Sequence, residues 1–478
     1  MRIKLISTVL AASAALAGCT LAPTYVRPDA PVATAYPADA AGKIERSAAD
    51  IGWREFFTEP RLQATIAAAL DNNRDLRIAA LRIEEARAQY NIQRADLLPT
   101  VSATAGEARA RVAYTLSATG TSIVTSSYQV GLSIPSFELD FFGRVRSLSN
   151  AALAQYLATE EARKAAQISL VAEVAKAYLA ERAFAEQLDL AQQTLAGRET
   201  AYKLAKQRFD VGASSALDLR LSEASAAAAR VAVATLTRQR AQAANALTLL
   251  VGKPLTDLPA AQALSSQNLV AELPAGLPSD LLTRRPDIRA AEQRLISANA
   301  NIGAARAAFF PRISLTASLG TASNTLAGLF DAGSRVWTFV PQLVLPIFDF
   351  GRNINNLDLA EVRKNIAVAD YEKSIQVAFR EVADALAARG TLNEQLDAQR
   401  VLTDAQADRL RLSEQRFANG VSSSLDVLDA QRELFSAEQS LVQTRLLRLT
   451  NAIDLYRTLG GGLQETTAVA TTTPTASK

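Results

Sequence analysis

The sequence predicts an α+β protein with two long helical hairpins and four β-strands, built from an internal duplication. Two observations carry this prediction. A turn motif occurs twice, at residues 208–219 and 416–427, each time within a long Pro-free run. After Pro99 and after Pro311 the apolar residues change from a helical period to a period of two, which is typical of strands.

The turn motif reads RFDVGASSALDL in its first copy and RFANGVSSSLDV in its second. A Gly at the end of a helical pattern supplies the left-handed residue that stops a helix. The Ser pair, followed by Leu-Asp, offers an N-cap for the next helix. The motif therefore predicts helix, tight turn, helix, twice over. A surface loop in an ordinary helical bundle is the alternative, and the recurrence in the same setting disfavours it.

The duplication extends far beyond the turns. Residues 75–99 match residues 287–311 without a gap, and Phe142-Gly143-Arg144 corresponds to Phe350-Gly351-Arg352. The offset is about 212 residues before the Phe-Gly-Arg element and about 208 after it. A single ancestral unit of roughly 200 residues was therefore duplicated, and such a repeat decides the fold before local propensity does.

The first residues have the pattern of a secretion signal. A basic start is followed by an apolar run, residues 5–16, that is too short to span a bilayer. Leu16-Ala17-Gly18-Cys19 resembles the bacterial lipobox, which predicts a lipid anchor on Cys19; a plain signal peptide is the alternative. Thr20 follows the Cys in place of Asp, as in lipoproteins sorted to the outer membrane. Cys19 is the only Cys, so no intrachain disulfide can form.

The composition excludes most enzyme chemistry. The chain has no His, one Cys and no Met beyond the first residue, so the commonest general base and metal ligand are missing. No phosphate-binding Gly loop of a recognised spacing occurs. The net charge is +3 with acids and bases interspersed, so no nucleic-acid patch is predicted. We expect no enzyme, no cofactor apart from covalent lipid, and no metal site.

The strand segments show alternation. Tyr128, Val130, Leu132 and Ile134 alternate with polar residues or Gly, as do Ile313, Leu315, Ala317 and Leu319, and a return strand is expected from Trp337 to Ile347. Alternation gives a sheet with one apolar face, which suits a soluble core. The lengths also suit a membrane-crossing β-strand of about 9–11 residues, and the pattern alone leaves both open.

The long helices limit the alternatives. Residues 144–209 and 352–417 each predict a helix of about 66 residues, roughly 100 Å long, with return helices at 217–250 and 425–459. Neither long helix contains an uncharged run of about 20 residues, so neither spans a bilayer. Four strands cannot close a barrel, and lipid does not tolerate an open edge. Two copies would give eight strands filled by side chains, and three would give twelve strands and a pore. A trimer follows if the protein is a channel.

The segments follow the duplication in chain order. They are a signal peptide at 1–18, an N-terminal arm at 19–60, a helix at 61–98, a β-hairpin at 99–142, a long helix with its turn and return helix at 143–252, a linker at 253–278, a helix at 279–310, a β-hairpin at 311–350, a second long helix with its turn and return helix at 351–460, and a disordered tail at 461–478.

Several motifs resemble the TolC/OprM family of outer-membrane efflux ducts, in its NodT-like lipoprotein branch. They are residues 277–288 (LPSDLLTRRPDI), residues 53–60, residues 72–76 and both turns. The resemblance covers essentially the whole mature chain. It implies a homotrimer with a twelve-stranded transmembrane β-barrel, four strands per chain, continued by a long α-helical barrel in the periplasm. It also implies an equatorial domain from residues 19–60, 253–278 and those near 460, and a lipid-anchored place in the Gram-negative outer membrane.

The same resemblance implies partners and a function. The two turns would lie at the periplasmic tips, where a membrane-fusion adaptor docks; the matching positions are Gly212, Ala213 and Ser214 in the first turn and Gly420, Val421 and Ser422 in the second. An inner-membrane transporter of the resistance-nodulation-division type would drive export of drugs or other small molecules. The chain would be a passive, gated duct. A structural trimeric scaffold without a pore is the alternative from another class.

The resemblance also implies a periplasmic gate, formed here by Asp218, Phe417, Asp426 and Asp429. Phe417 stands where the family has a Tyr and Ser422 where it has an Arg, so the family's latch bonds are missing; Arg416 or Arg411 are candidates to replace them. Helix N-terminal placement is the alternative role of Asp218 and Asp426. Asp426 and Asp429, three residues apart, share a helix face. A trimer would place six such carboxylates around one axis, where polyvalent cations would bind.

Overall fold

The computed structural model describes residues 20–33, 36, 47–117, 120–256, 258–267, 269 and 278–467, so Cys19 lies outside the described residues. The chain divides into two compact units. Unit 1 comprises Met1–Asp29, Arg82–Glu160 and Ala290–Glu372, and unit 2 comprises Ala30–Leu81, Glu161–Arg289 and Lys373–Lys478. None of the helices in the described ranges is apolar enough over a sufficient length to cross a membrane.

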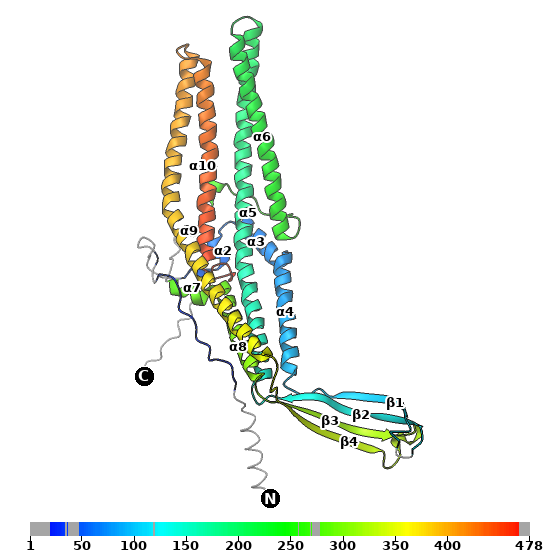
Figure 1. Cartoon of the computed structure of the whole chain (residues 1–478). Coiled ribbons are helices and arrows are strands. Elements are labelled where there is room, and N and C mark those ends of the chain that lie inside the picture. Colours follow the sequence, from blue (N-terminus) through cyan, green and yellow to red (C-terminus); the bar gives the residue numbers. More distant parts are fainter. Residues whose placement is uncertain are drawn as a thin grey trace, which may run out of the picture. The chain divides into compact units, whose positions relative to one another are not determined.

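Unit 1 contains one antiparallel sheet of four strands in the order β1-β2-β3-β4 (Figure 1). The strands are β1 (Ser102–Val112), β2 (Ile123–Leu139), β3 (Arg312–Ser323) and β4 (Arg335–Val344). Because β2 comes from the first repeat and β3 from the second, their pairing joins the two halves of the duplication. Within the described part of the chain, β1 and β4 each have one unpaired edge.

The strands β2 and β3 approach closely at a pair of glycines. Gly131 lies opposite Gly320 in the register. A Cβ on Gly320 would lie 2.2 Å from the Val130 carbonyl oxygen, and one on Gly131 would lie 2.6 Å from the Leu319 carbonyl oxygen. Only Gly fits at such a backbone approach. The register then shifts between Ile134 and Phe137, where Pro135 removes a ladder donor.

The return strand is shorter than the alternation predicts. It was expected to reach Ile347 but ends at Val344, because Pro346 follows and cannot donate to a ladder. Pro341 lies inside β4 and is tolerated there because β4 is an edge strand in this chain. The residues of strand β1 within the predicted hairpin were not identified from the sequence. A signal existed, because Glu107, Arg109 and Arg111 alternate with Ala108 and Ala110.

The prediction of one continuous helix at residues 61–98 is wrong. The helix is broken at Asn73 into α3 (Pro60–Asn72) and α4 (Arg74–Ala95). The Asn73 side chain accepts the Leu76 N–H at 2.8 Å and donates to the Leu250 carbonyl at 2.8 Å. Asn is a strong N-cap residue, and here its second bond fixes the break to the end of another helix.

In unit 1 the N-terminal arm is bound to the helix α8 (Pro286–Ala307). The Asn299 amide donates to the Pro23 carbonyl at 2.7 Å. Arg27 makes a bidentate pair with Glu292, with distances of 2.7 and 2.9 Å, and the Tyr25 hydroxyl donates to the same carboxylate. These charge-assisted bonds to a carboxylate that is only 9% exposed hold residues 23–27 in place.

Unit 2 has an aromatic core in which residues 53–57 contact Tyr456. The short helix α2 (Trp53–Phe56) contributes fully buried rings, and Phe56 stacks on Tyr456 with centroids 4.0 Å apart. The Tyr456 hydroxyl donates to the Ile51 carbonyl at 2.6 Å. The short elements near this core are η2 (Ala48–Asp50), η3 (Leu264–Ser266) and α7 (Pro278–Arg284), while η4 (Ala327–Phe330) belongs to unit 1.

A buried carboxylate fixes the inter-repeat linker to this core. Glu59 is 1% exposed. It accepts hydrogen bonds from the Tyr178 hydroxyl at 2.6 Å, the Gln262 N–H at 2.9 Å and the Gln267 amide at 2.6 Å. An unpaired buried charge would be costly, so these three donors are what make the position tolerable.

The beginning of the expected tail is ordered. The backbone N–H groups of Trp53 and Arg54 donate to the carbonyls of Gln464 and Glu465, at 2.9 and 3.2 Å. The prediction of a disordered tail is thus wrong for residues 461–467, which share hydrogen bonds with α2. Residues 468–478 lie outside the described part of the chain.

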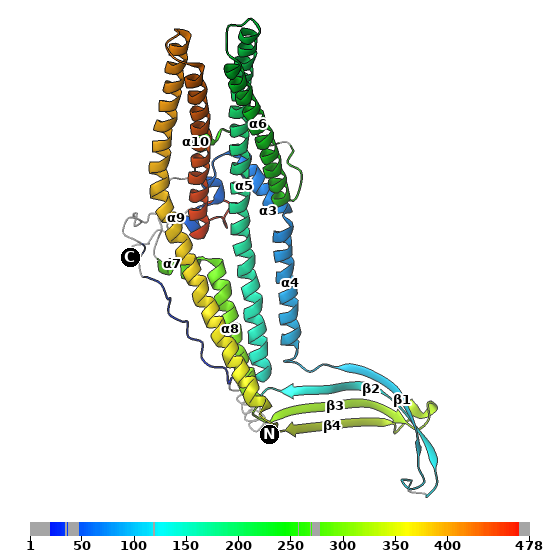
Figure 2. The ribbon, with the colours of Figure 1, turned by 45° about the horizontal axis from the view of Figure 1, so that its top comes forward.

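Both predicted helical hairpins are present. The long helix α5 (Arg144–Asp210) has 67 residues and is followed by α6 (Ala216–Val251). The long helix α9 (Arg352–Ala418) also has 67 residues and is followed by α10 (Ser424–Thr458). Figure 2 shows α5 beside α6 and α9 beside α10. In unit 2 the buried Leu188, Ala191 and Leu236 pack against Phe435, so the two hairpins share apolar contacts.

Candidate functional site

The two turns have the same backbone. Gly212 and Gly420 each have a φ of 72°, the left-handed conformation that the sequence predicts for the helix stop. The Ala213 N–H donates to the Arg208 carbonyl at 2.7 Å, and the Val421 N–H donates to the Arg416 carbonyl at 2.9 Å. These bonds close the last turn of each long helix in a Schellman arrangement. The helix-turn-helix prediction is confirmed for both copies.

Each return helix begins with a capping box. In α6 the Ser215 hydroxyl accepts the Asp218 N–H at 3.1 Å, and the Ser215 N–H donates back to the Asp218 carboxylate at 3.4 Å. In α10 the Ser423 N–H and hydroxyl both donate to the Asp426 carboxylate at 3.2 Å. The helix N-terminal role of Asp218 and Asp426 is therefore confirmed. It does not exclude a second role, because Asp426 is exposed and Asp218 is only partly buried.

A hydrogen bond joins the two turns. The Ser424 hydroxyl donates to Asp218 Oδ1 at 3.1 Å, across 206 residues of sequence. Hydrogen bonds from Ser215 and Ser424 lower the pKa of Asp218 below its usual range, because they stabilise the ionised carboxylate. Each turn thus contributes one partner to a contact between the repeats.

Asp429 lies between two guanidinium groups. Arg409 of α9 pairs with one oxygen at 2.7 Å, and Arg432 of α10 pairs with the other at 2.6 Å. Neither is one of the two residues that the sequence suggested as replacements for the missing family Arg, Arg416 and Arg411; Arg411 pairs with Asp408 on its own helix. Sequence reasoning missed Arg409, although a signal existed. Arg409 precedes Gly420 by 11 residues and Asp429 follows it by 9, so an antiparallel hairpin brings them opposite each other.

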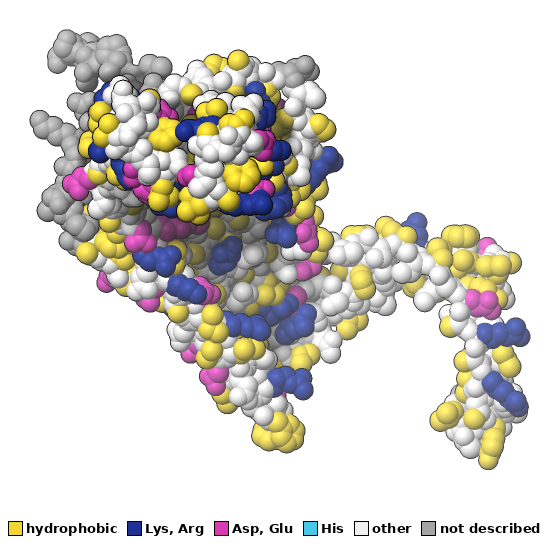
Figure 3. Space-filling view, turned by 90° about the horizontal axis from the view of Figure 1, so that it is seen from above, with side chains coloured by type: hydrophobic (Ala, Val, Ile, Leu, Met, Phe, Trp, Pro, Cys, Tyr) yellow, Lys and Arg dark blue, Asp and Glu magenta, His cyan; other side chains and the backbone are white. Residues whose placement is uncertain are grey.

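The other predicted site residues lie at the ends of the hairpins. Phe417 is 37% exposed and Val421 is 66% exposed. The hydroxyls of Ser214 and Ser422 are buried and have no hydrogen-bond partner in the described residues. Figure 3 shows this end from above, with acidic, basic and apolar side chains interspersed. Across the described ranges no group of three or more His, Cys, Asp or Glu could hold a metal ion.

Both repeats match the same family model. The model for the outer membrane efflux protein family covers residues 65–253 and 277–461, each of which includes one turn. The chain belongs to this family. It is 49% identical over 460 residues to TtgC, a probable efflux pump outer membrane protein of Pseudomonas putida, with 95% of each chain covered. It is also 49% identical over 455 residues to the outer membrane protein OprJ of Pseudomonas aeruginosa, with 94% of each covered.

Solved channels of outer-membrane efflux proteins have the same fold. The open state of the MtrE outer membrane channel of Neisseria gonorrhoeae is 45% identical, with a TM-score of 0.87 and coverage of 94% of this chain and 100% of that one. A structure of CusC is 41% identical, with a TM-score of 0.83 and coverage of 93% and 100%. The protein is therefore an outer-membrane efflux channel that extends into the periplasm, and its family consists of ducts and not of enzymes.

Proposed function

We propose that this chain forms the outer-membrane duct of a tripartite efflux pump, which exports drugs or other small molecules passively while an inner-membrane transporter supplies the energy. One observation carries the proposal. A four-stranded sheet with two open edges occurs in the same chain as two helical hairpins with 67-residue arms. The sheet suits the wall of a β-barrel in the membrane. The helical hairpins suit the wall of a tunnel that lies in water outside the membrane.

The open edges support a homotrimer. An unpaired strand edge is not tolerated in lipid, so β1 of one copy has to pair with β4 of another. Three copies give twelve strands, enough for a pore. The helix α9 also has an exposed apolar row, Ile354, Leu359, Val362 and Ile366, each more than 45% exposed, which suits packing on a neighbouring chain.

The oligomeric state in detergent tests this assembly. We expect only trimers by light scattering, since the barrel closes between chains and no folded monomer persists. A monodisperse monomer that retains its β-sheet circular dichroism signal would contradict the proposal.

The turns suit docking of a periplasmic adaptor, with a transporter of the resistance-nodulation-division type as the pump. Val211 and Val421 are 79% and 66% exposed at the two turns. Val421→Cys should form cross-links to the adaptor in cells treated with a short reagent that joins a thiol to a lysine amine. Val231→Cys is the matched control, because Val231 is 67% exposed but lies within α6. Equal cross-linking from both positions would place the docking surface elsewhere.

Covalent lipid on Cys19 is part of the proposal. Mass spectrometry of the mature N-terminus should find an acylated Cys19, and an unmodified residue would refute lipidation. Cys19→Ser should still insert into the outer membrane, because twelve strands bury far more apolar surface than two or three acyl chains do.

The gate is assigned to the second turn, with Asp426 and Asp429 around the axis of the trimer and Asp218 and Phe417 beside them. Two contacts support it: Ser424 to Asp218 joins the repeats, and Arg409 to Asp429 joins α9 to α10. These contacts stand in for the missing Tyr and Arg of the family. We expect low conductance of the resting channel and further block by trivalent cations from the periplasmic side.

A double substitution tests the gate. Asp426→Asn with Asp429→Asn should abolish the trivalent block in planar bilayers while the trimer remains intact. Asp397→Asn is the control, since Asp397 is an exposed α9 residue paired with Arg400 on the same helix. Block that survives the double change would place the constriction elsewhere.

A further inference from the structure

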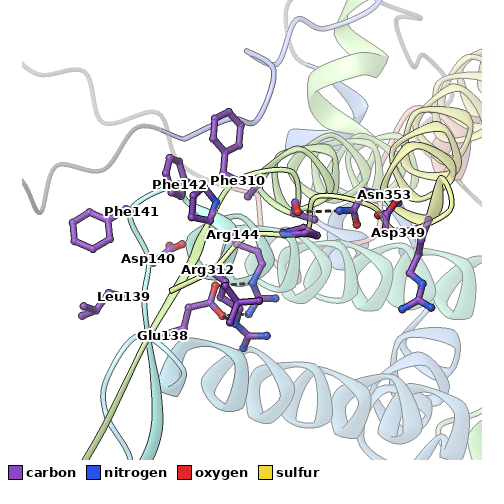
Figure 4. A pocket seen from close by; sticks show the side chains of 16 residues that line it. Glu138, Leu139, Asp140, Phe141, Phe142, Arg144, Phe310, Arg312, Asp349 and Asn353 are labelled. Carbon is purple, nitrogen blue, oxygen red and sulfur yellow. Dashed lines mark hydrogen bonds and ion pairs between the residues drawn. The ribbon is translucent and has the colours of Figure 1, made fainter. Parts of the chain in front are cut away.

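A cavity of about 320 Å³ lies in unit 1 where strands end and helices begin (Figure 4). It is lined by the end of β2, the start of β3, the end of β4 and the first residues of α5 and α9. None of the turn residues lines it.

Two cations share one carboxylate in this cavity. Glu138, whose side chain is 11% exposed, accepts two hydrogen bonds from the Arg144 guanidinium, at 2.8 and 2.7 Å. Arg312 pairs with the same carboxylate through Nε at 2.6 Å. Figure 4 shows the three side chains converging. Glu138 balances only one of the two positive charges of Arg144 and Arg312, so this part of the cavity has an excess of positive charge.

The other two acids of the lining are occupied by helix N-termini. Asp140 accepts the backbone N–H groups of Val145 and Arg146, at 3.1 and 2.9 Å. Asp349 accepts the backbone N–H groups of Gly351 and Asn353, at 3.0 and 2.9 Å. These carboxylates cap α5 and α9, and the helix dipoles partly offset their charge.

Guanidinium donors therefore remain for a ligand. The Arg312 side chain is 60% exposed in spite of its ion pair. Arg352 also lines the cavity and is exposed, and among the described residues its side chain has no ion pair. A guanidinium group matches a phosphate with two parallel hydrogen bonds, which makes a phosphate the best fitting anion.

The rim of the cavity is aromatic. Phe142 stacks on Phe310 with centroids 4.7 Å apart, and Phe141 and Phe310 are each about 40% exposed. Just before α9, Phe348 and Phe350, which do not line the cavity itself, are 77% and 88% exposed. A free phosphate ion would make no apolar contact with this rim. The glycerol and the upper acyl chain of a lipid would cover the rings and remove them from water.

We propose that this cavity binds the phosphate headgroup of a membrane phospholipid. Arg312 and Arg352 hold the phosphate, and the aromatic rim packs on the glycerol and the acyl chains. The inference rests on the proposed function in one respect: strands that cross the outer membrane put their ends at the level of the headgroups. A bound lipid would then fix the depth at which the strand-to-helix connections sit.

Native mass spectrometry of the delipidated full-length protein in detergent tests the proposal. Phosphatidylglycerol should bind saturably, and dioleoylglycerol, which lacks the phosphate, should not. Millimolar inorganic phosphate should fail to displace the bound lipid. Arg312→Ala and Arg352→Ala should each weaken phosphatidylglycerol binding about tenfold, the usual cost of one charged hydrogen-bond partner. Arg335→Ala is the matched control, because Arg335 lies at the other end of β4 and should leave binding unchanged.

Each remaining result would overturn the proposal. Equal binding of dioleoylglycerol, or unchanged binding in both Arg variants, would exclude a phosphate site. Displacement of bound phosphatidylglycerol by a low concentration of inorganic phosphate would assign the cavity to a soluble ligand. Loss of the trimer in the variants with unchanged lipid affinity would assign it to a subunit contact. The proposed function fails separately, through absence of wild-type conductance or a folded monomer in detergent, and neither result depends on lipid binding.

Discussion

The two turns share a backbone and differ in the side chains around it. Both have Gly at a φ of 72° and an Asp in a capping box. At the equivalent positions of the first repeat, however, Ala201 replaces Arg409 and Leu221 replaces Asp429, and Ala216 replaces Ser424. The duplication thus kept the residues that make the turn, while the Arg409–Asp429 ion pair and the Ser424 hydroxyl of the second repeat have no counterpart at the equivalent positions of the first. This asymmetry supports the proposal that the second repeat carries the gate.

The largest effect should come from Arg409→Ala, which gives the second repeat the residue of the first. An exposed ion pair contributes about 0.2–1 kcal/mol, so three copies in a trimer shift the closed–open equilibrium by about tenfold. We expect cells to become sensitive to a large polar antibiotic that the outer membrane normally excludes. Arg400→Ala removes the ion pair with Asp397 within α9 and should leave sensitivity unchanged. Equal sensitivity from both variants would show that the Arg409 pair has no special role.

The turn backbone should respond equally in both repeats. A Cβ on Gly212 or Gly420 meets nothing within 4 Å, so only the left-handed φ opposes a side chain. Gly212→Ala and Gly420→Ala should each cost about 1 kcal/mol of stability. Limited proteolysis at the turns measures this cost. A much larger effect at one turn would mean that the shared backbone is not equally important in both.

A smaller effect is expected from Ser424→Ala, again the residue of the first repeat. It removes a single exposed hydrogen bond to Asp218, which is worth about 0.5 kcal/mol, or about a twofold change in open probability per chain. Single-channel recordings should show this increase, and Ser440→Ala on the same helix should show none. An unchanged open probability would exclude Ser424 from the latch.

The smallest effect concerns Glu438 on α10, whose equivalent in the first repeat is Arg230. Burial raises the pKa of Glu438, because it disfavours the charged form. A raised carboxyl pKa destabilises the fold above that pKa, and the penalty disappears as pH falls below the unfolded-state pKa. Glu438→Gln should therefore raise the thermal midpoint slightly at pH 7 and leave it unchanged near pH 4. A gain of the same size at both pH values would contradict this cause.

The sequence was informative where local chemistry decides structure. Gly212 and Gly420 marked both turns, the alternation around Tyr128 and Ile313 marked strands, and the Pro-free runs marked the long helices. It failed where a distant partner decides. The break at Asn73 depends on the Leu250 carbonyl, and the order of residues 461–467 depends on backbone bonds to α2.

The candidate site follows the same division. The capping roles of Asp218 and Asp426 could be anticipated from the Ser that precedes each by three residues. The contact of Ser424 with Asp218 could not, because it spans 206 residues and requires the two hairpins to be adjacent. The cavity beside Glu138 could not be foreseen either, since its lining comes from the ends of three strands and three helices.

Single-channel conductance of the purified trimer in planar bilayers tests the central claim most directly. We expect the wild type to form a stable ion channel of low conductance. We also expect that the combined variant Arg409→Ala and Ser424→Ala, which makes the second turn resemble the first, conducts several times more current. If inserted trimers of both the wild type and the variant conduct no ions, the protein is not a duct, and the alternative of a structural scaffold without a pore is favoured.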